Sequence, residues 1–181
     1  FQLEGEALAV LDHPNIVKVF QSGQTDILFY LILEYVEGGT LRERLDGRPM
    51  PIRNAATLVE SIARAVQYAH EHQVIHRDLK PGNILLTQGS EIPKVGDFGL
   101  ARFVNRDSDL SRADTPLGTL EYMSPEQCQG PIKRIGPATD IYSLGVILYE
   151  LLTGRPPFQA ETSEREDHVG LLRRICEEEP V

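Results

Sequence analysis

The amino-acid sequence predicts an α+β fold in which short strands pair as hairpins and long helices supply most of the core. Three observations support this class. Two β-type runs, Ile16–Phe20 and Ile27–Leu33, lie close together near the N-terminus. A helical stripe of apolar residues runs from about Ile52 to His72, and residues 140–153 are apolar almost all round. With 181 residues, the chain can form one sizeable core, or a small lobe attached to a larger one.

The N-terminal region is predicted to be a helix followed by a hairpin. Apolar residues recur at helical spacing from Leu3 to Leu11, with Glu4 on the polar side. The helix should end at His13-Pro14, because a residue before proline is pushed out of the helical conformation. Residues 22–26, Ser-Gly-Gln-Thr-Asp, have the composition of a turn between the two strands.

A short helix and a long helix should follow the hairpin. Gly38-Gly39 ends the second strand, and Thr40 is placed to cap a helix that runs through Leu45. In the long helix from Ile52 to His72, the apolar positions form a single stripe: Leu58, Val59, Ile62, Ala65, Val66 and Ala69. This pattern predicts an amphipathic helix with one face against the core.

The second half of the chain should contain a second hairpin, a loop and a buried helix. Short β-type runs at Ile84–Thr87 and Ile92–Val95 flank the turn-like residues 88–90. The segment from Arg102 to Pro116 is polar and weakly patterned, which is typical of a mobile loop. The apolar run 140–153 is predicted to be a central helix that ends at Gly154.

Charge and cysteine content exclude several classes of function. The net charge of -9, without a basic stripe, argues against binding to nucleic acid. Cys128 and Cys176 lack a C-x-x-C partner, so they suggest neither a metal site nor a disulfide framework. The longest apolar run, Ile141–Leu152, is too short to span a bilayer, so no membrane segment is expected in this chain. Because the chain starts at Phe1, we expect it to be a piece of a longer protein.

The stretch His76-Arg77-Asp78-Leu79-Lys80-Pro81-Gly82-Asn83 carries the strongest chemical signal. Asp78 alone would be an ordinary loop carboxylate. Lys80 adds a positive charge suited to phosphate, Asn83 adds an amide oxygen, and Asp97 adds a second carboxylate a short distance along the chain. Hard oxygen ligands of this kind suit Mg²⁺. The pattern therefore predicts a phosphoryl-transfer centre, in which positioning and neutralisation of phosphate charge dominate.

At these residues the sequence resembles the eukaryotic-type protein kinases. Residues 76–83 match the catalytic loop of that family, Asp97-Phe98-Gly99 matches its metal-binding motif, and Ser124-Pro125-Glu126 matches the motif that closes its activation segment. Residues 34–39 resemble the hinge between the two lobes. The motifs occur in the family's order along essentially the whole chain, and the segments 122–127 and 152–158 look like those of bacterial members.

The resemblance implies one protein kinase domain with both ends incomplete. Residues 1–36 would form a partial N-lobe, consisting of the C helix, two strands and the hinge. Residues 37–181 would form a mainly helical C-lobe that lacks its last helices. Such a domain would act in the cytoplasm, either as a free protein or as the cytoplasmic domain of a membrane-anchored one.

The resemblance also implies roles for the catalytic-loop residues. Asp78 would orient the substrate hydroxyl and accept its proton, while Lys80 would steady the γ-phosphate of ATP. Asn83 and Asp97 would hold Mg²⁺. Lys80 further implies that the protein substrates are modified on Ser or Thr. His76 and Phe98 would pack in the apolar stack between the lobes, and Asp140 would anchor the catalytic loop.

Other roles follow from position in the family pattern. Glu4 would pair with a lysine of the N-lobe, although a solvated helix carboxylate is the alternative reading. The adenine of ATP would lie against Leu33, Val36 and Leu85, with its edge bonded to the backbone of Glu34 and Val36. Ordinary strand packing is compatible with the same three apolar residues.

A regulatory site is also implied in the activation segment. Thr115 occupies the position of an activating phosphothreonine, whose phosphate would bond to Arg77 and Arg102. Ser108 and Ser111 are alternative sites in the same loop. Thr119 would belong to the platform that receives the hydroxyl-bearing peptide.

Two features of an active kinase are missing from the sequence. No G-x-G-x-x-G occurs, and the four lysines, Lys18, Lys80, Lys94 and Lys133, all follow Glu4. Two hypotheses therefore compete. In the first, the parent protein is a serine/threonine kinase that uses ATP and Mg²⁺, and the isolated chain is expected to be weakly active or inactive. In the second, the chain is a pseudokinase-like or truncated module that binds partners without turnover. A hydrolase that uses the same carboxylates is a distant third.

Overall fold

The computed structural model describes residues 11–25, 29–89, 91–98, 120–129, 135–160 and 165–180, and the structural statements below concern these residues. They form an α+β fold, as predicted. In chain order the elements are β1 (Val19–Gln24), β2 (Phe29–Leu33), α2 (Leu41–Arg44), α3 (Ile52–Glu71), the 3₁₀ turn η1 (Pro81–Asn83), β3 (Ile84–Leu86), β4 (Pro93–Val95), α6 (Pro125–Gln129), α7 (Pro137–Thr153) and α8 (Arg165–Glu177). The helix predicted at residues 3–11 and the loop predicted at 102–116 lie outside the described residues, except for Leu11.

The first hairpin is shifted relative to its prediction. β1 and β2 pair antiparallel from Val19 opposite Leu33 to Gln24 opposite Phe29. Residues 22–24, which were predicted to be turn, are therefore part of the strand. The prediction was wrong here because backbone pairing can continue through polar and glycine residues when the partner strand is long enough. Ile16 instead forms an isolated parallel bridge with Val95, which joins this hairpin to the second one.

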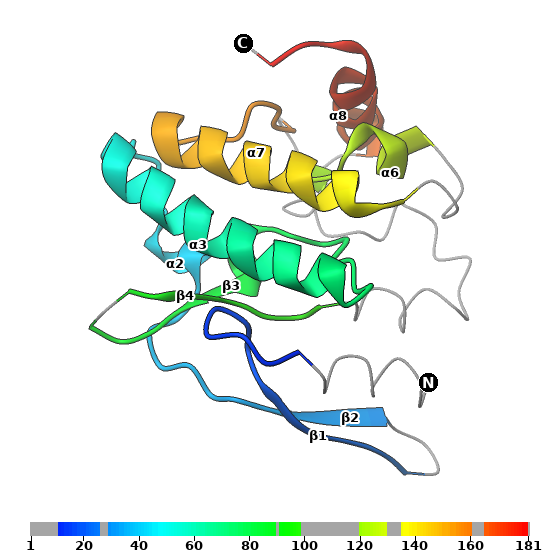
Figure 1. Cartoon of the computed structure of the whole chain (residues 1–181). Coiled ribbons are helices and arrows are strands. Elements are labelled where there is room, and N and C mark those ends of the chain that lie inside the picture. The colour runs from blue at the N-terminus through cyan, green and yellow to red at the C-terminus, as the bar shows by residue number, and fades with distance from the viewer. Residues whose placement is uncertain are drawn as a thin grey trace.

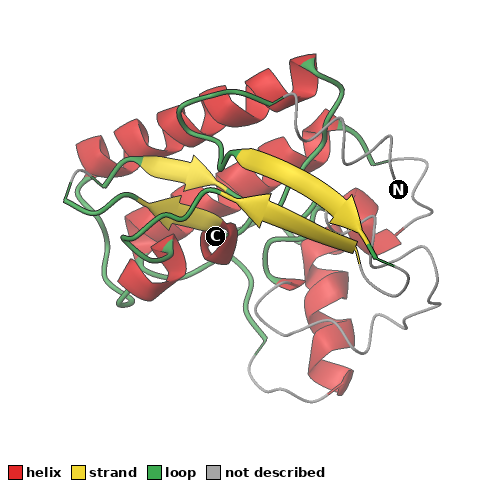
Figure 2. Cartoon of the chain, turned by 90° about the horizontal axis from the view of Figure 1, so that it is seen from below, coloured by secondary structure: helices red, strands yellow, loops and turns green. Residues whose placement is uncertain are grey.

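The second hairpin confirms its prediction with slightly shorter strands. β3 and β4 pair antiparallel, with Ile84 opposite Val95 and Leu86 opposite Pro93. In Figure 2 the two hairpins lie next to each other on one side of the helices. The loop that precedes β3 and the residues that follow β4 consequently emerge close together.

The short helix α2 begins as predicted, at an N-cap formed by Thr40. The Glu43 amide donates to Thr40 Oγ1 over 3.2 Å, and the Thr40 amide donates to Glu43 Oε2 over 2.9 Å. This reciprocal arrangement is a capping box, which satisfies two amides that a helix start would otherwise leave without partners.

Helices α3 and α7 form the centre of the molecule, where they lie side by side (Figure 1). The predicted stripe of α3 faces inward, since its buried members are Ala55, Ile62, Ala65, Val66 and Ala69. From α7, Ile147 and Leu151 are both 0% exposed in the same core. α7 starts at Pro137, three residues earlier than predicted, and ends at Gly154 in the left-handed conformation, as expected.

Helices α6 and α8 pack on the side of α7 that is remote from β1 and β2 (Figure 1). They enclose a second apolar cluster made of Leu120, Cys128, Phe158, Leu171 and Ile175. Cys128 and Cys176 are not joined by a disulfide. Within the described ranges, no helix has both the length and the hydrophobicity needed to span a membrane.

Candidate active site

The catalytic-loop residues are held by a buried carboxylate from a distant helix. Asp140 lies in the first turn of α7 and is 0% exposed. Its Oδ2 accepts from the His76 amide over 2.9 Å, and its Oδ1 accepts from the Arg77 amide over 2.8 Å. The N-terminal end of a helix favours a negative charge, and the two amides replace its lost hydration. Asp140 therefore anchors the loop, as the family resemblance implied.

Two of the predicted site residues converge on the carboxylate of a third, Asp78. Lys80 Nζ lies 2.8 Å from Asp78 Oδ2, and Asn83 Nδ2 donates to the Asp78 carbonyl over 2.8 Å and contacts Oδ2 at 3.2 Å. The side chains of Asp78 and Lys80 keep 30% and 22% of their surface exposed. The carboxylate is thus oriented by protein groups and still open to a substrate.

The loop backbone explains why Asp78 faces outward while its neighbour is buried. Arg77 has φ 68°, a conformation that non-glycine residues rarely adopt. His76 on one side of this turn is 0% exposed, whereas Asp78 on the other side is half-buried. Downstream, Pro81 begins η1, and the Asn83 amide donates to the Lys80 carbonyl over 2.9 Å. This tight turn brings Asn83 back to Asp78.

Asp97 is placed beside the loop by the end of β4. The Gly96 amide donates to the Asn83 carbonyl over 2.9 Å, so the chain leaving β4 is tied to the residue that precedes β3. Asp97 itself is exposed and has φ 56°. The hydrogen bond of Gly96 therefore keeps the backbone of Asp97 next to the segment that carries Asn83.

His76 packs against the metal-binding motif and does not face solvent. Its Nε2 lies 2.8 Å from the Gly96 carbonyl, and its ring centroid lies 4.8 Å from that of Phe98. Burial lowers the pKa of His76, and the nearby Asp140 carboxylate opposes this only in part. The neutral ring then donates from Nε2 to Gly96. The packing role predicted for His76 fits this geometry better than proton transfer would.

Asn83 and Asp97 offer the oxygen ligands that suit Mg²⁺. The described part of the chain contains no group of three or more His, Cys, Asp or Glu side chains that could hold a metal. Mg²⁺ commonly keeps its waters and takes only one or two protein ligands, together with phosphate oxygens. An amide oxygen and an exposed carboxylate on adjoining segments fit that mode of binding.

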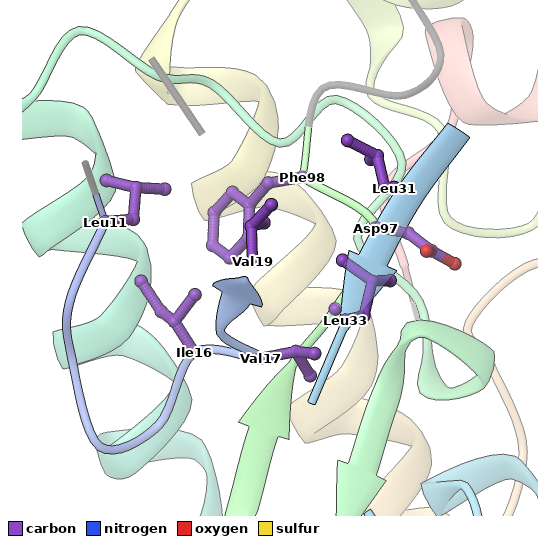
Figure 3. A pocket seen from close by; sticks show the side chains of 9 residues that line it. Leu11, Ile16, Val17, Val19, Leu31, Leu33, Asp97 and Phe98 are labelled. Carbon is purple, nitrogen blue, oxygen red and sulfur yellow. The ribbon is translucent and has the colours of Figure 1, made fainter. Parts of the chain in front are cut away.

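An open pocket, lined mainly by apolar side chains, includes Asp97 (Figure 3). Its other lining residues are Leu11, Ile16, Val17, Val19, Leu31, Leu33, Gly96 and Phe98. In Figure 3 the ring of Phe98 points toward Leu11 and Val19, whereas the carboxylate of Asp97 points the opposite way. Phe98 therefore adds its ring to the apolar lining of the pocket, and Asp97 is the one charged residue among the described residues of that lining.

The predicted adenine-binding residues lie on two neighbouring segments. Leu33, at the end of β2, lines the pocket described above. Val36, three residues further along the chain, is half-buried. Thr40 forms an isolated antiparallel bridge with Leu85, which brings the segment after β2 against β3. A methyl group at Gly38 would lie 2.1 Å from the Leu86 carbonyl oxygen, so this close approach requires glycine.

Glu34 is fixed by both its backbone and its side chain. Its amide donates to the Lys18 carbonyl over 2.8 Å, and its carboxylate lies 2.9 Å from Lys94 Nζ. Burial alone would raise the pKa of Glu34, but the hydrogen bonds and charges of Lys94 and Lys18 bring it below the usual value. The side chain and the amide of Glu34 thus hold the segment, and the role of its backbone in adenine binding stays a prediction.

Four predicted site residues, Glu4, Arg102, Thr115 and Thr119, lie outside the described residues, and their roles stay predictions. Arg77 is described. Its amide binds Asp140, and its carbonyl accepts from Gln127 Nε2 over 2.7 Å. The backbone of Arg77 therefore links the catalytic loop to both α7 and α6.

Sequence reasoning missed a cluster that fixes the chain just before α6. Tyr122 donates its hydroxyl to Glu150 Oε2 over 2.5 Å, and Arg42 from α2 lies 3.2 Å from Glu150 Oε1. Burial and the bond to Glu150 raise the pKa of Tyr122. These residues stand 28 and 108 positions from Glu150, so spacing along the chain carries no signal of the contact.

His70 was also missed. Its Nε2 lies 2.7 Å from Asp140 Oδ2, and only 15% of its side chain is exposed. One signal was present, because His70 follows Val66 by four residues and so continues the apolar stripe of α3.

Comparison with known proteins agrees with this geometry. The protein kinase domain family matches residues 1–179. The chain is 40% identical over 164 residues to serine/threonine-protein kinase PrkC of Bacillus subtilis (strain 168), covering 90% of this chain and 25% of PrkC. It is 40% identical to PknB of Mycobacterium leprae, with 87% and 26% covered, and 37% identical to PknB of Mycolicibacterium smegmatis, with 99% and 30% covered.

The chain thus spans about a quarter to a third of the length of these relatives. Its match to the domain family extends over nearly all of its own residues. With the family's catalytic-loop and metal-binding motifs side by side in the structure, the chain belongs to the protein kinase family.

Proposed function

We propose that this chain carries the catalytic core of a serine/threonine protein kinase, which transfers the γ-phosphate of ATP to Ser and Thr hydroxyls of proteins. The observation that carries the proposal is the convergence of Lys80 and Asn83 on Asp78, beside the exposed Asp97. Relatives that carry the name serine/threonine-protein kinase, at 36 to 40% identity, support the same chemistry.

In this reaction the oxygen of the substrate hydroxyl attacks the γ-phosphorus, and the bond from that phosphorus to the β–γ bridging oxygen breaks. Asp78 orients the hydroxyl and receives its proton as the new bond forms. Lys80, 2.8 Å from Asp78, places its ammonium where it can neutralise the charge of the transferred group. Asn83 keeps the Asp78 carboxylate in place through its side-chain amide.

Asn83 and Asp97 would hold Mg²⁺ through their side-chain oxygens, and the ion supplies charge neutralisation at the phosphates. The adenine ring would lie against Leu33, Val36 and Leu85, with the backbone of Glu34 and Val36 at its edge. The bridge between Thr40 and Leu85 supports this arrangement, because it brings the segment after β2 close to β3.

The proposal is tested by exchanging Asp78 for asparagine and measuring phosphate transfer from ATP to a basic protein in the presence of Mg²⁺. Asp78→Asn preserves the shape of the side chain but removes the proton acceptor, so the rate should fall by at least about 100-fold. The matched control is Asp46→Asn, which changes an exposed carboxylate that pairs only with the neighbouring Arg48 among the described contacts.

Equal rates for the wild type and the Asp78→Asn variant would refute the catalytic assignment. A wild-type protein that binds ADP but transfers no phosphate would instead support the alternative, a non-catalytic module with a kinase fold.

A further inference from the structure

We propose that His70 is a positioning residue for the catalytic loop and acts through Asp140. The proposal builds on the proposed function, since the loop it positions is the one that presents Asp78. Its starting point is the contact of 2.7 Å between His70 Nε2 and Asp140 Oδ2, which joins the end of α3 to the start of α7.

Asp140 is a buried acceptor that needs several donors. The same carboxylate accepts the two loop amides, so we assign to His70 the tautomer that donates from Nε2. The His76 amide shares Oδ2 with His70, and the Arg77 amide binds Oδ1. Two of these three donors belong to the catalytic loop itself, whereas His70 belongs to a helix.

That difference gives His70 a distinct effect. The amides of His76 and Arg77 belong to the loop that is being held, so they can move together with the Asp140 carboxylate. They therefore do not set its orientation. His70 is attached to α3, whose neighbouring residues Val66 and Ala69 are 2% and 0% exposed in the core. The imidazole therefore fixes the rotation of the carboxylate relative to the rigid pair of α3 and α7.

The orientation of the Asp140 carboxylate affects the positions of both functional aspartates, Asp78 and Asp97. Arg77, bonded through its amide, directly precedes Asp78. His76, bonded through its amide, packs its ring against Phe98, which directly follows Asp97. A rotated Asp140 would consequently shift the groups on both sides of the transferred phosphate, and reaction rates are sensitive to displacements of about 1 Å.

The test compares three variants of His70 and of a neighbour. His70→Phe keeps an aromatic ring and loses the donor, whereas His70→Gln keeps an N–H that can reach the carboxylate. The control is His72→Phe, which changes an exposed histidine one residue beyond the end of the same helix. Steady-state phosphate transfer from ATP to a basic protein gives kcat and KM, and hydrogen exchange gives the protection of the amides at 76 and 77.

We expect His70→Phe to lower kcat roughly tenfold and to change KM for ATP by less than about twofold, because positioning acts on the reacting groups. His70→Gln should retain at least about a third of the wild-type kcat. The amides at 76 and 77 should exchange faster in His70→Phe and at the wild-type rate in His72→Phe.

Equal losses in His70→Phe and His70→Gln would overturn the proposal, since packing and not the hydrogen bond would then matter. Unchanged exchange at 76 and 77 in His70→Phe would also overturn it. If the wild type transfers no phosphate, the proposed function fails, and the exchange measurement alone decides whether His70 holds the loop.

Discussion

His76 shows how a histidine in a catalytic motif can serve a purely structural purpose. The ring is enclosed between Phe98 and the Gly96 carbonyl, and none of its surface is exposed. Burial disfavours the imidazolium, so the pKa of His76 lies below the ordinary value of 6.5. A protonated ring would be charged but cut off from water in the folded protein. Protonation of His76 therefore favours the unfolded state.

This coupling predicts a loss of stability in mild acid. Above about pH 6.5 the ring is neutral in both states and has no effect; below it, the unfolded chain takes up a proton that the folded protein excludes. Stability should therefore fall as the pH drops below 6.5, by at most about 1.4 kcal/mol per pH unit for one proton. Urea unfolding of the wild type and His76→Phe at pH 7.5 and pH 5.5 measures this.

The His76→Phe variant should show the smaller difference between the two pH values. His13, whose pKa is also lowered by burial, contributes to the slope that remains. The exposed residue His72 provides a control, because His72→Phe should keep the wild-type dependence. A slope unchanged in His76→Phe would contradict this interpretation.

Two residues of the proposed site, Arg77 and Asp97, have an unusual backbone conformation. Arg77 and Asp97 have φ values of 68° and 56°, although neither is glycine. Non-glycine residues pay a steric penalty in this region, and such strain persists only where surrounding contacts impose it. Here the contacts are the bonds of Arg77 to Asp140 and of Gly96 to Asn83, so the loop geometry depends on long-range partners.

Helix α7 shows how one glycine can decide where an element ends. Gly154 has φ 84°, and its amide donates to the Glu150 carbonyl over 2.8 Å. A Cβ atom there would lie 2.4 Å from the Gly47 carbonyl oxygen. Both the left-handed conformation and the close approach to the segment after α2 exclude a side chain at this position.

Gly154→Ala should destabilise the fold by roughly 1–3 kcal/mol, because alanine must either keep the strained conformation or displace Gly47. The control is Gly145→Ala in the same helix, where an added methyl group meets nothing within 4 Å. That change should be neutral or stabilising by about 0.5–1 kcal/mol, since glycine disfavours helix interiors. Thermal unfolding measures both, and similar effects for the two variants would contradict the assigned role of Gly154.

Over the whole molecule, the packing of α3 against α7 supports the site. The Met50 amide donates to the Leu151 carbonyl over 2.7 Å, so the segment before α3 is tied to α7 as well. Ile62 from α3 and Ile147 from α7 are both fully buried in one cluster, which also contains Leu79 of the catalytic loop. The loop is thus attached to the two helices both by Asp140 and by core packing.

Ile147→Ala should therefore cost about 2–5 kcal/mol of stability, because it leaves a cavity in this cluster. Ile141→Ala is the matched control, since Ile141 lies in the same helix with 63% of its surface exposed. Its effect should stay within about 0.5 kcal/mol. Urea unfolding separates the two cases, and a small effect of Ile147→Ala would show that the α3–α7 contact is not the stabilising centre.

Elements with strong periodicity were predicted well, and weakly patterned ones were not. The stripe from Leu58 to Ala69 identified α3, and Thr40 identified the start of α2. The extent of β1 was misjudged, because strand pairing is decided by the partner and not by the strand's own side chains. The five-residue helix α6 is too short to show a helical period, and it was missed.

The sequence by itself determined the local chemistry of the site. Asp78, Lys80 and Asn83 lie within six residues, so a single tight turn is enough to bring their side chains together. The family resemblance implied that Asp140 anchors this turn, but only the tertiary structure decided which bonds hold it. Asp140 stands 63 residues from Arg77 and 70 from His70, and its bonds to them require that α3 and α7 pack side by side. Hydrogen bonds between distant residues depend on the folded arrangement of their helices, which spacing along a chain does not encode.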